Sequence, residues 1–143
     1  MQFWFLAVPF LSGLGLVSPV PVTAEDPKAP TAYIAKVDPD AFRPVPLEHK
    51  KLGVTVDPAT VRMITPGVDK FSIYKLIGPP HFGEMITRRW NYVLFFPVAP
   101  GSVERQRCRM EIRFTRERGH YSVTVSDVVW QDRACADRVA AAR

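Results

Sequence analysis

The sequence is poor in the residues that build metal sites and nucleophilic sites: its 143 residues include only two cysteines and three histidines. His49, His81 and His120 lie far apart, and none has a carboxylate or a cysteine at a spacing that suggests a site. Two cysteines without a neighbouring histidine give no tetrahedral metal set. No serine lies in a nucleophile elbow, and no glycines have phosphate-loop spacing. We therefore expect no enzyme and no cofactor, and we interpret His81 as a packed loop residue.

Charged side chains are absent from the first 24 residues. This stretch has an apolar core of signal-peptide length, and residues 22–24 form a small-residue cleavage site. Residues 1–24 are therefore predicted to be a signal peptide that is removed on export. The alternative is a retained membrane anchor, although prolines and glycines interrupt the apolar run and leave it short for a span. No cysteine lies near the predicted cut, which excludes a lipid anchor attached there.

The remaining composition is that of one globular domain with a basic surface. Hydrophobic residues make up 47% of the chain, which is enough for a core. The net charge is +5, from 19 Lys and Arg against 14 Asp and Glu. This charge suits an acidic partner, an anionic membrane surface or nucleic acid, and the predicted export argues against nucleic acid. The alternative is a basic surface that serves solubility alone.

Both cysteines, Cys108 and Cys135, lie in the part of the chain that would be exported. A pair of cysteines in an exported chain usually forms one disulfide. The alternative is two reduced, buried thiols.

Residues 25–56 are rich in proline and polar residues, which excludes a long helix. We expect this segment to be an extended arm, and the folded domain to comprise residues 57–135. Residues 136–143 are predicted to be a frayed helical tail.

Two short helices are expected at the start of the domain. Asp57 is a typical N-cap with Pro58 at the first helical position. Asp69 caps a second helix over residues 69–78, which ends at Gly78 because Pro79 and Pro80 cannot continue it. Its apolar face is predicted at helical spacing, as either Phe71, Tyr74 and Ile77 or Ile73, Leu76 and Ile77.

Three strands should follow, over residues 88–97, 107–116 and 121–130. Alternation puts one set of apolar side chains on the core side of the sheet: Trp90, Tyr92, Leu94, Phe96, Cys108, Met110, Ile112, Phe114, Tyr121, Val123 and Val125. The alternation slips near residues 126–127, which predicts a β-bulge. The expected fold is α+β, with two short N-terminal helices packed on a three-stranded antiparallel sheet.

The order of these features resembles the SmpA/OmlA (BamE-like) family. The family pattern covers residues 61–130 here. It consists of a short helix, a helix that ends in a Gly and Pro motif, a W-x-Y strand and an alternating strand. The structural residues of the family motif would be Gly67, Gly78, Pro80, Trp90 and Tyr92. A strand cysteine with a second cysteine in the tail resembles the disulfide-containing form of this domain.

The resemblance implies a periplasmic scaffold of the Gram-negative envelope with a two-layer fold. Such a domain supports outer-membrane protein assembly or envelope integrity, with the assembly complex as one partner, and it is expected to be monomeric alone. Two alternatives are a secreted inhibitor of the β-lactamase-inhibitor type and an accessory subunit of a secretion machine. The family's usual lipid-carrying cysteine is missing here.

An arginine-rich face of the sheet is the predicted partner-binding patch. Arginines alternate with the core residues of the middle strand, and the outward side of the preceding strand carries apolar residues. The residues assigned to partner binding are Arg89, Val93, Phe95, Arg109 and Arg113. The patch would bind envelope protein, and anionic lipid headgroups would suit the same charge. The alternative is a solvated face whose arginine stems cover apolar surface.

Overall fold

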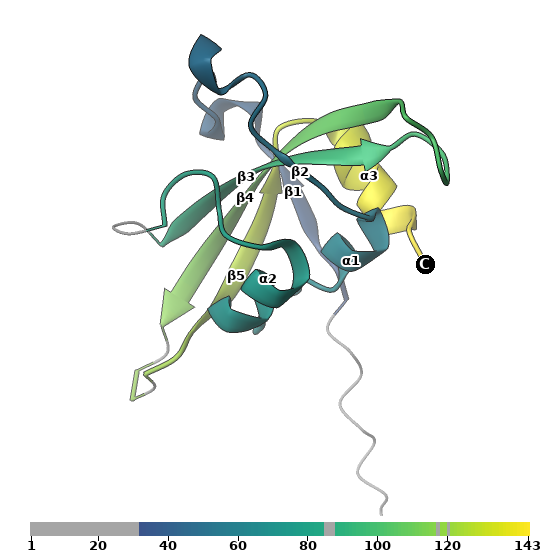
Figure 1. The fold of residues 1–143 in the computed structure, drawn as a ribbon. Coiled ribbons are helices and arrows are strands. Elements are labelled where there is room, and N and C mark those ends of the chain that lie inside the picture. The colour runs from purple at the N-terminus through teal and green to yellow at the C-terminus, as the bar shows by residue number, and fades with distance from the viewer. Residues whose placement is uncertain (1–31, 85–87, 117, 120) are drawn as a thin grey trace, which may run out of the picture.

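The computed structural model describes residues 32–84, 88–116, 118–119 and 121–143. These residues form one mixed five-stranded sheet in the order β1-β5-β4-β3-β2 (Figure 1). Its centre is antiparallel and consists of β3 (Arg89–Pro97), β4 (Arg105–Arg116) and β5 (Val123–Trp130). The short outer strands β1 (Ala35–Val37) and β2 (Val54–Thr55) run parallel to β5 and β3.

The expectation of a three-stranded antiparallel sheet with two helices is therefore wrong. Both added strands come from the proline-rich segment 25–56, and a third helix follows β5. Proline excludes a long helix, but it leaves short extended stretches between prolines whose N–H groups can pair at a sheet edge. Residues 35–37 and 54–55 are two such stretches.

An aspartate is the N-cap residue directly before each of the three helices, α1 (Pro58–Arg62), α2 (Lys70–Ile77) and α3 (Arg133–Ala141). Asp57 accepts a hydrogen bond from the Ala59 N–H at 2.8 Å, and Asp69 accepts one from the Ser72 N–H at 3.0 Å. Gly78 ends α2 with a φ of +79°, a conformation that favours glycine. The two predicted N-caps and the predicted end of the second helix are confirmed.

The core lies between the three helices and one face of the sheet. The predicted inward residues of β3 and β4 are buried, and so are Val125, Val128 and Trp130 of β5. A register shift pairs Arg113 with Asp127 but Phe114 with Val125, so Ser126 is the extra residue of the predicted bulge. The prediction failed at Tyr121, which precedes β5 and is 99% exposed.

A disulfide between Cys108 and Cys135 joins β4 to α3. Cys108 faces the core opposite Leu94 of β3, and both cysteines are buried. Residues 136–141, expected to be part of a frayed tail, belong to α3, and Val139 is fully buried against the sheet. Figure 1 shows α3 beside the end of the sheet where β4 begins.

Within the described part of the chain, no helix is long and apolar enough to cross a membrane. The predicted signal peptide, residues 1–24, lies outside the described residues. The division into signal peptide, arm 25–56, domain 57–135 and tail stays a prediction.

Candidate functional site

The sheet face opposite the helices carries the residues that alternate with the core positions of β3 and β4. The cross-strand register brings Val93 opposite Arg109, Phe95 opposite Arg107, and Asn91 opposite Glu111. Side chains of directly opposed residues lie on the same face. The arginines and apolar residues assigned to partner binding therefore do share one face.

Residues 42–53, which we name the strap, cover part of this face. The strap lies at the top of Figure 1. Phe42 is buried, with the Arg109 guanidinium carbon 5.2 Å from its ring centroid, and Arg109 donates a hydrogen bond to the Arg43 carbonyl. Gly53 approaches Phe95 so closely that a Cβ at this position would stand 2.3 Å from the ring. The strap therefore packs tightly on the sheet with little room for larger residues.

Arg109 is 8% exposed, so its charge is largely withdrawn from solvent. Burial, helped by the nearby charge of Arg107, lowers the pKa of the Arg109 guanidinium. The cation–π contact with Phe42 and the hydrogen bond to the Arg43 carbonyl offset the loss of hydration of the guanidinium. Arg109 thus holds the strap on the sheet in the free chain.

A second buried charge lies two residues further along β4. Glu111 is 3% exposed and accepts hydrogen bonds from Arg113 Nε at 2.7 Å and from Asn91 at 3.3 Å. A buried carboxylate needs such partners, and removing one would leave it uncompensated. Arg113 therefore contributes to the stability of the sheet.

The five residues assigned to partner binding share a face but differ in accessibility. Val93 is fully buried and Arg109 nearly so, whereas Phe95 and Arg113 are partly exposed and Arg89 is exposed. The strap accounts for the burial of Arg109, because Phe42 and the Arg43 carbonyl contact its guanidinium. Strand alternation cannot predict this contact, since the strap is far from β4 in the sequence. Their role in partner binding stays a prediction.

The family-motif residues occupy structural positions around α2. Gly67 donates to the Val125 carbonyl at 2.8 Å, Tyr92 donates its hydroxyl proton to the Gly78 carbonyl at 3.0 Å, and Pro80 is buried. Burial raises the pKa of the Tyr92 hydroxyl, which favours its neutral, donating form. Trp90 is buried between Tyr74 and Phe114.

His81 follows these residues and accepts a hydrogen bond through Nδ1 from the Val93 N–H at 3.2 Å. Burial lowers its pKa, which keeps the accepting neutral form. This environment gives His81 a structural role in the loop after α2. No group of three or more His, Cys, Asp or Glu side chains suited to a metal ion occurs in the described ranges.

Two exposed aromatic residues were not assigned to any site from the sequence. Phe71 is 78% exposed and Tyr121 is 99% exposed, and both line one cavity with Tyr74 and Trp90. Phe71 belonged to one of the two alternative apolar faces predicted for the second helix, but the buried residues of α2 are Ile73 and Ile77. Tyr121 was placed on the core side because the strand was expected to begin there.

The fold and its two faces define a small disulfide-linked α+β domain, with helices on one face of the sheet and a strap on the other. Residues 53–121 match the family described as "Outer membrane protein assembly factor BamE domain". The match confirms the resemblance to the SmpA/OmlA (BamE-like) family over these residues. No curated protein and no solved structure matches the chain.

Proposed function

We propose that this protein is a non-enzymatic binding domain of the Gram-negative periplasm that supports the assembly of outer-membrane proteins. The observation that carries the proposal is the BamE-domain match over residues 53–121. The buried disulfide supports it, because disulfides persist in oxidising compartments such as the periplasm. The signal peptide predicted at residues 1–24 would deliver the chain there.

The exposed part of the strap-covered face is the contact surface that we propose for this role. Arg89 and Arg107 are exposed there, beside the partly exposed Phe95. Arginine beside an aromatic ring is enriched at protein interfaces. Arg109 and Arg113 are poorer test positions, because they hold the strap and Glu111 and their loss would destabilise the fold.

Affinity capture from detergent-solubilised envelopes tests the proposal. The full chain, carrying a C-terminal tag, is expected to enrich the outer-membrane assembly complex over an equally abundant, tagged periplasmic protein. Charge reversal at Arg107 should reduce that enrichment while the thermal unfolding curve stays unchanged. Equal recovery of the complex by the control protein would contradict the proposed function.

A further inference from the structure

The outer edge of β2 carries backbone groups that have no partner. Val56 donates its N–H to the Phe95 carbonyl at 3.1 Å, so its backbone faces β3. Neighbouring residues of a strand direct their backbone groups to opposite sides, so the N–H and C=O of Thr55 and the N–H of Asp57 point away from β3. Among the described residues, none of these three groups has a hydrogen-bond partner. At the other edge of the sheet, α3 packs against β1. The β2 edge is therefore open for pairing.

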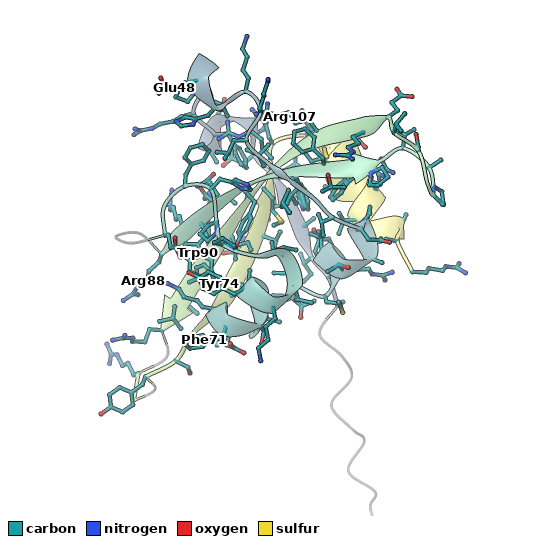
Figure 2. All side chains as sticks on the ribbon, viewed as in Figure 1. Glu48, Phe71, Tyr74, Arg88, Trp90 and Arg107 are labelled. Carbon is teal, nitrogen blue, oxygen red and sulfur yellow. A yellow bond between two sulfur atoms is a disulfide. The ribbon has the colours of Figure 1, made fainter. Side chains whose placement is uncertain are left out.

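The two faces of this edge differ in polarity. Val54 and Val56 are partly buried and pack against the core on the helix side of the sheet. Thr55 lies on the strap side, where its Oγ1 accepts a hydrogen bond from Arg105 at 2.8 Å. Figure 2 labels the exposed Arg107, which follows Arg105 on the same side of β4. A strand added to this edge would therefore lie beside apolar side chains on one face and polar side chains on the other.

A cavity of about 390 Å³ lies where β2 leads into α1. Its apolar walls come from the end of β2, the start of α1, the end of β3 and the loop that follows: Val56, Pro58, Pro97, Val98, Ala99 and Pro100. Thr55, Asp57 and Arg138 also line it, but each of these polar side chains already has a hydrogen-bond partner. The cavity is therefore suited to an apolar side chain.

We propose that the β2 edge and this cavity form a docking site for one strand of an outer-membrane β-barrel protein before it has folded. Such strands are segments of about ten residues in which apolar and polar side chains alternate. The backbone of the strand would pair with Thr55 and Asp57, as in strand addition, and one of its apolar side chains would enter the cavity beside Val56. The site adjoins the proposed contact surface, because Thr55 lies opposite Phe95 in the register. The inference rests on the proposed function and names the class of substrate that the domain would hold.

Because the open edge is short, pairing should be weak and reversible, and a titration followed by nitrogen-15 NMR suits it. The probe is a synthetic peptide of about ten residues in which apolar residues alternate with threonine and serine. We expect a saturable shift of the Thr55 amide signal and slower exchange of its proton with solvent. Peptide binding that leaves the exchange of the Thr55 amide unchanged would overturn the inference, and so would absence of binding.

Two matched peptides separate backbone pairing from non-specific apolar binding. N-methylation of the central residues removes the N–H groups that would pair, so the slower exchange at Thr55 should disappear. A peptide of the same composition without alternation should bind at least about tenfold more weakly. Equal effects of all three peptides would overturn the inference. Slower exchange at Thr55 that depends on protein concentration in the absence of peptide would also overturn it, because a second copy of the chain would then occupy the edge.

A proline variant tests the edge in the protein itself. Thr55→Pro removes the outward N–H and leaves the hydrogen bonds between β2 and β3 intact, since these come from Val54 and Val56. Proline is tolerated on edge strands where the N–H faces solvent. Thr55→Val is the matched control, because it also lacks the hydroxyl that contacts Arg105 but keeps the N–H. The proline variant should bind the peptide at least about tenfold more weakly than the valine variant. Equal affinity in the two folded variants would overturn the inference.

A variant in the cavity keeps the inference testable if the proline variant fails to fold. Val98 is 49% exposed and lines the cavity, so Val98→Asp should weaken peptide binding about tenfold without changing the unfolding curve. Val103→Asp is the matched control, because Val103 is 94% exposed in the loop between β3 and β4 and does not line the cavity. Unchanged affinity in Val98→Asp would overturn the inference.

Envelope capture after chemical crosslinking distinguishes failure of this site from failure of the proposed function. The Thr55→Pro protein should lose the unfolded β-barrel proteins that the original protein and Thr55→Val recover, while it still recovers the assembly complex. Full recovery of β-barrel proteins by Thr55→Pro would overturn the docking site and leave the proposed function standing. Failure of the original protein to recover the complex would contradict the proposed function, whereas the peptide titration would still decide whether the β2 edge binds an extended strand.

Discussion

Replacing both cysteines, by Cys108→Ala and Cys135→Ala, should lower the free energy of unfolding by about 3–4 kcal/mol. The disulfide closes a loop with a sequence separation of 27 residues. For a loop of this length, the chain-entropy model gives about 3.5 kcal/mol at 25 °C. The bond also holds α3, whose Ala136 and Val139 are part of the core. Loss of the link should therefore destabilise the whole domain as well as its C-terminal end.

Urea unfolding followed by tryptophan fluorescence measures this effect. With a slope of about 1.5–2 kcal/mol/M, the midpoint should fall by about 2 M urea. The original protein, unfolded in the presence of a thiol reductant, is the control and should match the double variant. A loss below about 1 kcal/mol would refute the reasoning that the link restricts the unfolded chain.

Three further changes test individual contacts. Tyr33→Phe removes the acceptor of the 2.6 Å hydrogen bond from the Trp130 indole and should cost about 1–3 kcal/mol. Burial raises the pKa of Tyr33 from 10.0 to about 12, so its stabilising contribution is complete below pH 10 and is lost as the pH rises toward 12. Across this pH range the free energy of unfolding should therefore change less in Tyr33→Phe than in the original protein. Asp69→Ala removes the cap of α2 and should lower the free energy of unfolding, measured in urea, by about 1 kcal/mol. Hydrogen bonds from Ser72 lower the pKa of Asp69, so the difference in stability between variant and original protein should shrink as the pH falls through that pKa. A constant difference down to low pH would contradict the cap. Gly53→Ala should lower the free energy of unfolding by about 1–3 kcal/mol and expose the strap to proteolysis, because the alanine Cβ would overlap the Phe95 ring. An unchanged rate of proteolysis would contradict close packing of the strap.

Local signals in the sequence predicted much of the helical layer and the central sheet. The caps at Asp57 and Asp69 and the glycine end at Gly78 depend on neighbouring residues alone, and all three are confirmed. Alternation of apolar residues likewise located the core side of β3 and β4, and its interruption located the bulge at Ser126. These features need no information from distant parts of the chain.

The edge strands and the covered face could not be predicted in this way. Pairing of residues 35–37 with β5 spans most of the chain, and an isolated three-residue stretch carries no periodic signal. Burial of Arg109 depends on Phe42 packing back over the sheet, and alternation alone placed Arg109 in solvent. The cavity lined by Tyr121 was missed for a related reason, because this residue lies just before β5 and outside its alternation.

Depletion of the protein in its own bacterium tests the central claim most directly. Quantitative mass spectrometry of outer-membrane fractions would measure the abundance of β-barrel proteins before and after depletion, with inner-membrane proteins as the internal control. The proposed function predicts a selective fall in outer-membrane β-barrel proteins, restored by the original chain. Unchanged levels of these proteins after complete depletion would contradict a role in their assembly.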